Sequence, residues 1–385
     1  MQVKSRIFTK RIVLCINCIK LCVFSLIVQN NSAYLCQKNK MASLIINPTM
    51  LTFITTYTCT SACKSCCFQC SPKRKEKLSI DEMKRYIDVS VESYNSLKIM
   101  VLTGGEAFIY GKKIEDIARH AVSKGLMTRI VSNGFWAKNY DTAYKRIENL
   151  IKAGLTEINF STGDDHLEFV PIETIKNGVL ASLRQGLTVV INVESGSNRK
   201  FDSKFLLEDS DFKEYLTSRK LMIVSGLWIP FTQSEEDSVE SSETNKGVTV
   251  TDSYTRCQNL FSGITIDPNH RLLACCGMTS KHIAYLDLGD VRQYSIKDLY
   301  ESQFSDFMKI WLATEGAHKI MDFIATYTDM DDNYKTEHNC QVCEKILSNP
   351  QYLQILKGNY RNIYSNVLLK YFINRKELHY ENEKT

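Results

Sequence analysis

Residues 50–70 read MLTFITTYTCTSACKSCCFQC, an apolar run that stops at a cysteine-rich loop. The run at 50–57 predicts a buried strand, because it is short and rich in β-branched and aromatic residues. Cys59, Cys63 and Cys66 follow it in a CxxxCxxC pattern. Three thiolates on one short loop can hold three irons of a [4Fe–4S] cube and leave the fourth iron open, whereas four cysteines close a cluster. The pattern therefore predicts a cluster with one free iron.

Strands and helices alternate after this loop. The apolar patterns predict strands at 98–103, 127–132, 156–162, 187–193 and 221–225, and helices near 79–97, 112–124, 140–153 and 171–186. Such alternation implies parallel strands joined by right-handed crossovers. The expected fold class is therefore α/β, as a partial (β/α)6 TIM-like barrel. In barrels of this kind the chemistry gathers at the carboxyl ends of the strands.

Two short motifs follow strands at that edge. Gly104, Gly105 and Glu106 come directly after the strand at 98–103, and Ser132–Gly134 follow the next strand. A glycine pair lets bare backbone approach a ligand, and a carboxylate can meet an ammonium group. The alternative is that the two glycines only form a tight turn and contact no ligand.

A CxxxCxxC loop after the first strand, with Gly-Gly-Glu after the second, resembles the radical S-adenosylmethionine (radical SAM) superfamily. The resemblance implies that the amino and carboxylate groups of S-adenosylmethionine (SAM) chelate the open iron. It also implies that the reduced cluster cleaves the C–S bond of SAM, and that the resulting 5′-deoxyadenosyl radical removes a hydrogen atom from the substrate.

The family's site residues carry over by position. Cys59, Cys63 and Cys66 would ligate the cluster, and Gly104–Glu106 would hold the methionine amino group. The residues expected near the ribose or carboxylate, on strand position, are Ser132, Asn133, Ser161 and Asn192. Ser65 departs from the family, which usually has an aromatic residue or His there to pack against adenine. Cys67 and Cys70 exceed the three ligands needed.

A second cysteine group lies near the C-terminus. It comprises Cys257, Cys275, Cys276, Cys340 and Cys343. Distant segments that converge in this way could close a second [4Fe–4S] cluster, although the CxxC at 340–343 suits zinc equally well. The apolar pattern here predicts a strand over 271–276, joined to a preceding strand by a turn at Asp267–His270. Residues 257–277 resemble the SPASM or Twitch auxiliary modules of radical SAM enzymes, in the single-cluster form.

That resemblance implies four ligands and one spare thiol. The implied ligands of the auxiliary cluster are Cys257, Cys275, Cys340 and Cys343. Cys276 would then be a catalytic hydrogen-atom donor to a substrate radical. Two alternatives stay open, since Cys276 could be a small buried side chain or could replace Cys275 as ligand.

Two polar stretches remain. Residues 163–169 (GDDHLEF) follow the fourth strand, so Asp164, Asp165 and His166 are expected on the active-site side, where Asp165 either caps a helix or contacts substrate. Residues 73–77 (KRKEK) predict a solvated surface or a docking point for an acidic leader peptide.

The charge of the chain is concentrated at its start. The 385 residues carry a formal charge of +5, but residues 1–40 hold seven basic and no acidic residues, which leaves −2 for the rest. A near-neutral body argues against a nucleic-acid-binding protein. Residues 12–28 are apolar and could be a signal peptide, a short membrane anchor, or sequence upstream of a start at Met41. Lys20 would be costly in a bilayer, so a membrane partner is not expected.

The predicted organisation has five parts. These are a basic and apolar prefix (1–45), a radical SAM core (48–230), a polar linker (231–250), an auxiliary cluster module (251–348) and a helical tail (349–385). The expected protein is a cytoplasmic enzyme that modifies a peptide or protein and takes electrons from a reductant such as flavodoxin or ferredoxin. The outcome would be epimerisation, a crosslink or maturation of another enzyme. The alternative is a non-catalytic iron–sulfur or zinc protein that carries electrons or joins partners.

Overall fold

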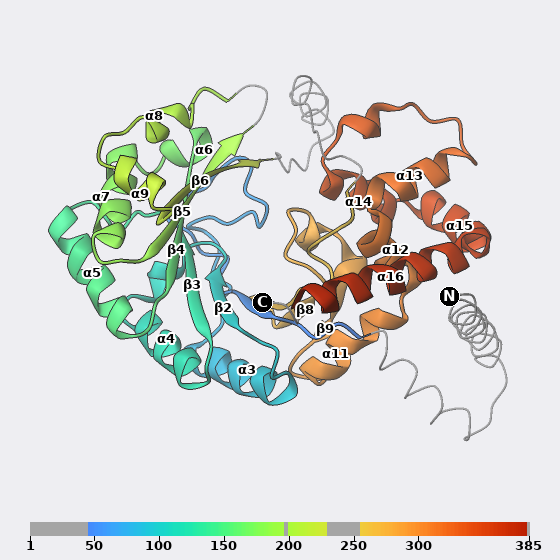
Figure 1. Ribbon diagram of the computed structural model, residues 1–385, viewed down its shortest axis with the longest axis horizontal. Helices are drawn as coiled ribbons and strands as arrows, with labels where there is room; N and C mark the ends of the chain where they lie inside the picture. Colours follow the sequence, from blue (N-terminus) through green and yellow to red (C-terminus); the bar gives the residue numbers. More distant parts are fainter. Residues whose placement is uncertain (1–44, 196–198, 229–254, 383–385) are drawn as a thin grey trace, which may run out of the picture.

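One nine-stranded sheet runs through the molecule, and its first six strands are parallel (Figure 1). The computed structural model describes residues 45–195, 199–228 and 255–382, with side chains up to residue 374. The strand order is β6-β5-β4-β3-β2-β1-β7-β8-β9. Among the described residues, neither outer strand, β6 or β9, pairs with a further strand, so this part of the chain forms an open sheet. The predicted linker, and the predicted prefix apart from Ile45, lie outside the described residues.

The parallel strands alternate with helices as the sequence predicts. The strands are β1 (Met50–Ile54), β2 (Ile99–Thr103), β3 (Met127–Ser132), β4 (Glu157–Thr162), β5 (Thr188–Ser195) and β6 (Leu221–Leu227). The longer helices between them are α3 (Ile80–Ser93), α4 (Lys113–Ser123), α5 (Tyr140–Lys152) and α7 (Ile172–Leu183). Short helices are η1 (Ala107–Tyr110), α6 (Asp164–Leu167), α8 (Lys204–Leu207) and α9 (Lys213–Thr217).

The helices line the convex side of this curved sheet (Figure 1). Phe160 on β4 and Ile191 on β5 are fully buried. The opposite side of the same strands is only partly covered: Ser161 pairs with Asn192, and Asn192 pairs with Val224 of β6, which is 44% exposed. Side chains alternate between the faces of a strand, so Ser161 and Asn192 share the inner face of the partial barrel.

The C-terminal part is built onto the other edge of β1. Strand β7 (Gly263–Ile266) pairs parallel with β1, and β8 (Arg271–Leu273) and β9 (Asp287–Asp290) extend it antiparallel. The predicted turn at Asp267–His270 joins β7 to β8, and the Asp267 amide donates to the Arg271 carbonyl at 3.0 Å. The two cysteine-bearing regions therefore share one sheet.

Helices complete the C-terminal part. They are α11 (Ile296–Ser302), α12 (Phe307–Glu315), α13 (Ala317–Ala325), α14 (Asn339–Ser348), α15 (Pro350–Asn359) and α16 (Tyr364–Asn382). Single 3₁₀ turns η4 (Gln303–Ser305), η5 (Asn333–Thr336) and η6 (Tyr360–Asn362) lie between these helices, whereas η2 (Ser280–His282) and η3 (Ala284–Leu286) lie between β8 and β9. Helices α15 and α16 form the predicted helical tail. Among the described helices, none has the length and apolarity needed to span a bilayer.

Two predicted strands are too long. The first ends at Ile54 instead of Tyr57, because Thr56 leaves the ladder and forms a bridge with Lys77. The strand predicted over 271–276 ends at Leu273, since the next amide, that of Ala274, donates to the Leu286 carbonyl in η3. Both strands give way to a segment that carries cysteines.

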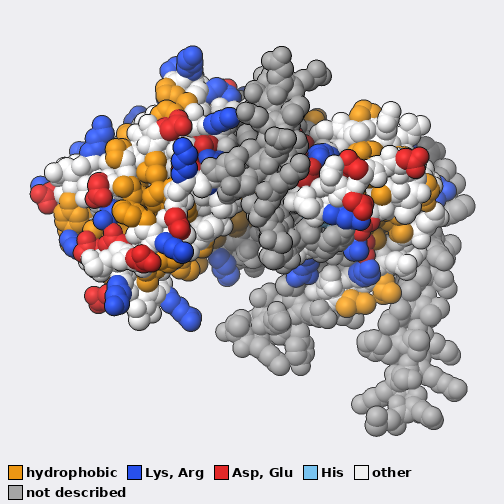
Figure 2. Space-filling view, turned by 90° about the horizontal axis from the view of Figure 1, so that it is seen from above, with side chains coloured by type: hydrophobic (Ala, Val, Ile, Leu, Met, Phe, Trp, Pro, Cys, Tyr) orange, Lys and Arg blue, Asp and Glu red, His pale blue; other side chains and the backbone are white. Residues whose placement is uncertain are grey.

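On the face of the molecule seen in Figure 2, basic and acidic side chains are interspersed.

The β1–β7 pairing depends on a residue without a side chain. A Cβ added to Gly263 would lie 2.7 Å from the Met50 carbonyl oxygen, which is closer than real contacts allow. We expect Gly263→Ala to lower the free energy of unfolding by about 1–3 kcal/mol, because the ladder must shift to relieve the overlap. Urea denaturation followed by circular dichroism measures this.

Gly358 in α15 is the matched control. A Cβ there meets nothing within 4 Å, so Gly358→Ala should leave stability unchanged or raise it by up to about 1 kcal/mol. Equal stability of Gly263→Ala and the wild type would contradict the proposed strain at the β1–β7 edge.

Candidate functional site

The cysteine loop leaves β1 and folds back on itself. The Cys59 amide donates to the Ser71 carbonyl and the Ser71 amide to the Tyr57 carbonyl, both at 3.2 Å. A turn within the loop links the Cys66 amide to the Cys63 carbonyl at 3.2 Å. Cys59 is buried, and Cys63 and Cys66 are half-buried. The three predicted ligands thus lie on one compact loop at the carboxyl end of the central strand.

The thiols on this loop influence one another. Burial, together with the charges of Cys66 and Cys59, raises the pKa of Cys63 well above its usual range. Burial raises the pKa of Cys59 to about 11, whereas a hydrogen bond from Cys70 lowers that of Cys66 to about 6. Iron binds the thiolate form, so a bound cation would favour ionisation that burial alone opposes. The donor set of three neighbouring thiols fits an iron–sulfur cluster.

The glycine pair brings the end of β2 against this loop. The Gly105 amide donates to the Thr56 carbonyl at 2.6 Å, and the Glu106 amide to the Thr58 carbonyl at 3.1 Å. A Cβ on Gly105 would lie 2.0 Å from the Thr58 carbonyl oxygen, and Gly104 has a φ of +123°. The close approach that these glycines permit is therefore to the cysteine loop itself. Their contact with the amino group of SAM stays a prediction.

Glu106 connects three predicted cofactor residues. Its fully buried carboxylate accepts hydrogen bonds from the Ser132 hydroxyl at 3.0 Å and from the Asn133 amide at 2.8 Å. The Asn133 side chain in turn donates to Thr60 and Ser61, each at 3.0 Å, and lies 3.6 Å from Cys59 Sγ. The second and third strands thereby reach the first cysteine ligand. Burial raises the pKa of Glu106 to about 7.

Ser161 and Asn192 lie on the inner face of β4 and β5. They are direct neighbours across the two strands. Asn192 Oδ1 is buried without a hydrogen-bond partner among the described residues. Gly226 of β6 lies beside it, where a Cβ would come within 2.7 Å of Oδ1. Buried acceptors are normally satisfied, so this oxygen marks a place for a ligand's donor groups and fits a polar cofactor such as SAM.

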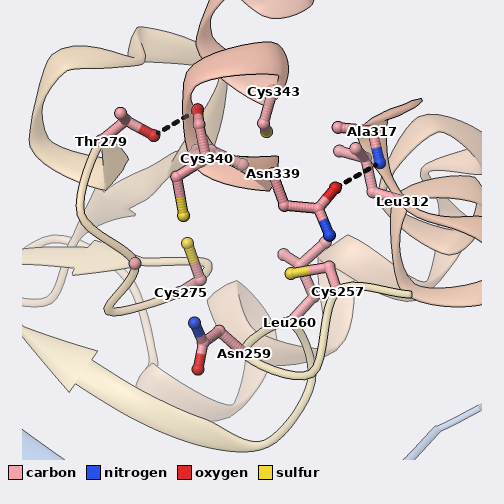
Figure 3. A pocket seen from close by; sticks show the side chains of 12 residues that line it. Cys257, Asn259, Leu260, Cys275, Thr279, Leu312, Ala317, Asn339, Cys340 and Cys343 are labelled. Carbon is pink, nitrogen blue, oxygen red and sulfur yellow. Dashed lines mark hydrogen bonds between the residues drawn. The ribbon is translucent and has the colours of Figure 1, made fainter. Parts of the chain in front are cut away.

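Four of the five C-terminal cysteines line one cavity (Figure 3). They are Cys257, Cys275, Cys340 and Cys343. The cavity is partly open to solvent. In Figure 3 the sulfurs of Cys275 and Cys340 face each other. Cys276 is half-buried and does not line the cavity, so it is the thiol left over.

Three separate segments supply these thiols. Cys340 and Cys343 lie one turn apart in α14, and the Cys340 carbonyl accepts a hydrogen bond from the Thr279 hydroxyl at 3.0 Å. Cys257 is fixed by its amide, which donates to the Leu312 carbonyl at 3.0 Å. The Asn339 side chain donates to the Thr255 carbonyl at 2.8 Å and so joins α14 to the segment that carries Cys257.

Burial dominates the chemistry of these four thiols. It raises the pKa of Cys340 to about 11 and those of Cys257, Cys275 and Cys343 above their usual value. Within the described part of the chain, no three His, Cys, Asp or Glu side chains are arranged to hold a single metal ion. The sulfurs surround a space instead of meeting at a point.

The C-terminal part also holds the first cysteine loop. Lys281 Nζ donates to the Phe68 carbonyl at 2.5 Å, and His282 Nε2 lies 2.9 Å from the Cys67 carbonyl. The buried Tyr57 hydroxyl donates to Asp267 at the end of β7 at 2.7 Å. No local sequence signal marks these contacts, because each partner is more than 200 residues away in the chain.

One residue of the acidic stretch after β4, Asp165, contacts the cysteine loop. Asp165 accepts a hydrogen bond from the Ser65 amide at 2.8 Å and pairs with Arg199, and His166 pairs with the buried Glu194. Asp164 accepts from the Lys200 amide at 2.6 Å. Sequence reasoning missed Glu194 and Arg199. The position of Glu194 in β5, near its carboxyl end, was a usable signal, whereas nothing local marks Arg199.

Comparison with known proteins bears on the first site. Residues 53–170 match the model of the radical SAM superfamily. The matched segment, which is under a third of the chain, is similar to a radical SAM domain. The match spans the cysteine loop, Glu106, Ser132, Asn133 and Ser161, and it ends before the second cavity. Members of this superfamily are enzymes that use a [4Fe–4S] cluster and SAM, so the radical SAM domain implies both cofactors.

Solved structures resemble the chain only distantly. Native anSMEcpe with bound AdoMet has a TM-score of 0.49 at 11% identity and covers 84% of this chain and 99% of its own. BtrN in complex with AdoMet and 2-DOIA has a TM-score of 0.43 at 12% identity, with coverages of 71% and 89%. HydG, a maturase of the [FeFe]-hydrogenase, has a TM-score of 0.39 at 12% identity, with coverages of 91% and 88%. No curated protein matches the sequence.

The buried Glu106 gives the radical SAM domain a pH-dependent stability. Its folded pKa of about 7 lies above the ordinary 4.5, so the folded state holds this proton more tightly than the unfolded state. The stabilisation is full below pH 4.5 and is lost as the pH rises toward and through 7, by up to about 3 kcal/mol. We expect Glu106→Gln to flatten this slope in urea denaturation between pH 5 and 8.

Glu82 offers a matched control, since its pKa is lowered and it is a capping residue of α3. Glu82→Gln should keep the wild-type slope over the same range. An unchanged slope in Glu106→Gln would show that this carboxyl does not titrate there.

Proposed function

We propose that the chain is a radical SAM enzyme that cleaves SAM reductively and abstracts a hydrogen atom from a peptide or protein substrate. The observation that carries this proposal is the cysteine loop. Its three thiols lie on one loop at the carboxyl end of β1, where they would leave one iron of a [4Fe–4S] cluster without a protein ligand, and Asn133 and Glu106 tie the loop to the next two strands.

The residues of the chain would divide the work. Cys59, Cys63 and Cys66 would hold the [4Fe–4S] cluster, while Gly104, Gly105 and Glu106 with Ser132 and Asn133 would fix the loop and meet the methionine end of SAM. Asn192 would accept a hydrogen bond from SAM through its unpartnered oxygen, next to Ser161. When bound, the cluster and SAM supply the 5′-deoxyadenosyl radical, and the protein supplies position and shelter from water.

We propose further that the second cavity holds an auxiliary [4Fe–4S] cluster on Cys257, Cys275, Cys340 and Cys343, as in a SPASM or Twitch module. A single zinc ion would need its four sulfurs around one point at Zn–S distances of about 2.3 Å. The four thiols that line the cavity are the donor set that a closed cluster needs. Cys276, adjacent to a ligand yet outside the cavity lining, would be the hydrogen-atom donor to a substrate radical.

The substrate and partners follow from the same modules. Auxiliary-cluster modules of this kind resemble those of peptide-modifying enzymes, so a peptide or protein is the proposed substrate. Electrons would come from a reductant such as flavodoxin or ferredoxin. Ten free cysteines among the described residues suit a reducing compartment, and the cytoplasm is proposed as the location.

Formation of 5′-deoxyadenosine tests the proposed reaction. After anaerobic reconstitution with iron and sulfide and reduction with dithionite, the wild type should convert SAM to 5′-deoxyadenosine, measured by liquid chromatography. Cys63→Ala should lower this by at least about 100-fold, because the loop would lose one of three ligands.

Cys67→Ala, on the same loop, is the matched control and should retain activity. A wild type that binds iron and produces no 5′-deoxyadenosine would sink the enzyme and favour the non-catalytic alternative.

Iron content tests the auxiliary cluster separately. The wild type should bind about eight irons per chain, and Cys343→Ala about four, since a closed cluster needs four thiolates. Cys276→Ala should keep about eight. A wild type with about four irons and one zinc would refute the second cluster.

A further inference from the structure

A buried network ties the first cysteine loop to the far side of the barrel. Its members are Ser65, Asp165, His166, Glu194 and Arg199, which we call the loop clamp. Ser65 lies 100 residues before Asp165 and 134 before Arg199. Strands β2 and β3 separate β1 from β4 and β5, so the clamp spans the mouth of the partial barrel.

Glu194 is the anchor of the clamp. Its side chain is fully buried near the end of β5, and its two oxygens accept the backbone amides of Asp165 at 2.8 Å and His166 at 3.1 Å. The His166 ring pairs with the same carboxylate. A Cβ on Gly163 would lie 2.5 Å from Glu194 Cβ, so only glycine lets the chain pass the anchor there. The segment that carries Asp165 is therefore locked to β5.

Asp165 and Arg199 extend from this anchor to the loop. Asp165 accepts the Ser65 amide at 2.8 Å and forms an ion pair with Arg199. Arg199 also donates to the Ser65 hydroxyl at 3.0 Å and lies 3.1 Å from Glu194. The loop residue is thus held through both its backbone and its side chain. Charge-assisted hydrogen bonds of this sort are stronger than neutral ones and more directional.

The identity of residue 65 makes this contact possible. Ser65 stands where the radical SAM family usually has an aromatic residue or His, and any polar atom on such a ring would lie farther from the backbone than the Ser65 hydroxyl to which Arg199 donates. Ser65 is only 4% exposed and directly precedes the proposed ligand Cys66. The serine therefore exchanges a ring contact for a fixed hydrogen-bonded position of the loop.

We propose that Arg199 and Asp165 are positioning residues that hold the Cys63–Cys66 segment at a set place relative to Ser161 and Asn192. The inference rests on the proposed function, because those two residues matter only if SAM binds beside them. Loss of the clamp should let the loop move without removing any thiol. A loop that moves relative to Ser161 and Asn192 would bind SAM less tightly, so the expected effect is on KM for SAM.

The test compares Arg199→Gln, Asp165→Asn and the conservative Arg199→Lys with the wild type. Arg119→Gln, which removes an exposed ion pair to Asp116 at 2.7 Å, is the matched control. Circular dichroism and iron analysis establish that each variant folds and binds iron. Electron paramagnetic resonance of the reduced cluster, with and without SAM, then reports whether SAM still perturbs it, and kinetics give KM for SAM and kcat.

For Arg199→Gln and Asp165→Asn we expect a rise in KM for SAM of about tenfold with kcat within about threefold, and a matching shift in the SAM concentration that changes the resonance signal. Arg199→Lys should show a smaller rise in KM for SAM, since lysine keeps the positive charge but lacks the planar guanidinium that donates to two partners at once. The control should equal the wild type. Wild-type KM and resonance response in both clamp variants would overturn the proposal, even if their melting temperatures fall.

A readout without cofactors separates this inference from the proposed function. Lys64 is exposed within the loop, so trypsin cleavage after it, followed by mass spectrometry of the iron-free full chain, reports loop mobility. The clamp variants should be cleaved about fivefold faster there than the wild type and the control. If the wild type fails to process SAM, the proposed function falls and this rate alone decides the clamp, with equal rates rejecting it.

Discussion

The arrangement of the first site depends on the contact between Gly105 and the backbone at Thr56–Thr58. Any side chain at this position would overlap the Thr58 carbonyl, which a Cβ would approach to 2.0 Å. Because Gly105 lets β2 approach the cysteine loop, the Glu106 carboxylate lies where it accepts hydrogen bonds from the Ser132 hydroxyl and the Asn133 amide. Asn133 can then reach the first cysteine. One missing side chain thereby sets the relation between β1, β2 and β3 at their carboxyl ends.

The sequence predicted the parallel half of the fold well, because each strand and helix carries its own period and its own stop signal. Helix α3, for example, begins at a Ser79–Glu82 capping box that is visible in the sequence. It predicted less well where tertiary contacts decide. Strand β9 has the sequence DLGD, which has no strand character of its own and is paired only because β8 lies beside it. The pairing of β7 with β1 joins residues more than 200 apart, and no local pattern encodes it.

The same division holds at the sites. Cysteine ligands can be predicted from residue type and spacing. The four cysteines predicted as ligands near the C-terminus line one cavity, and Cys276 does not. Asn133 and Glu106 were found because they follow strands. Arg199, Lys281 and His282 were out of reach, because their roles come from backbone carbonyls and carboxylates of remote segments. The glycine pair was only partly interpreted. The sequence indicated that another group approaches these glycines closely, but it did not indicate that this group is the cysteine loop.

The continuous sheet also has a consequence for how the protein is made. Strand β1 is translated before its second partner, β7, which follows about 200 residues later, roughly 10–40 s at ordinary synthesis rates. During that interval β1 has one unpaired edge beside a loop of free thiols, a state open to mispairing and oxidation. The first cysteine loop can therefore take its final position only after synthesis of the C-terminal half, because Asp267, Lys281 and His282 hold it there.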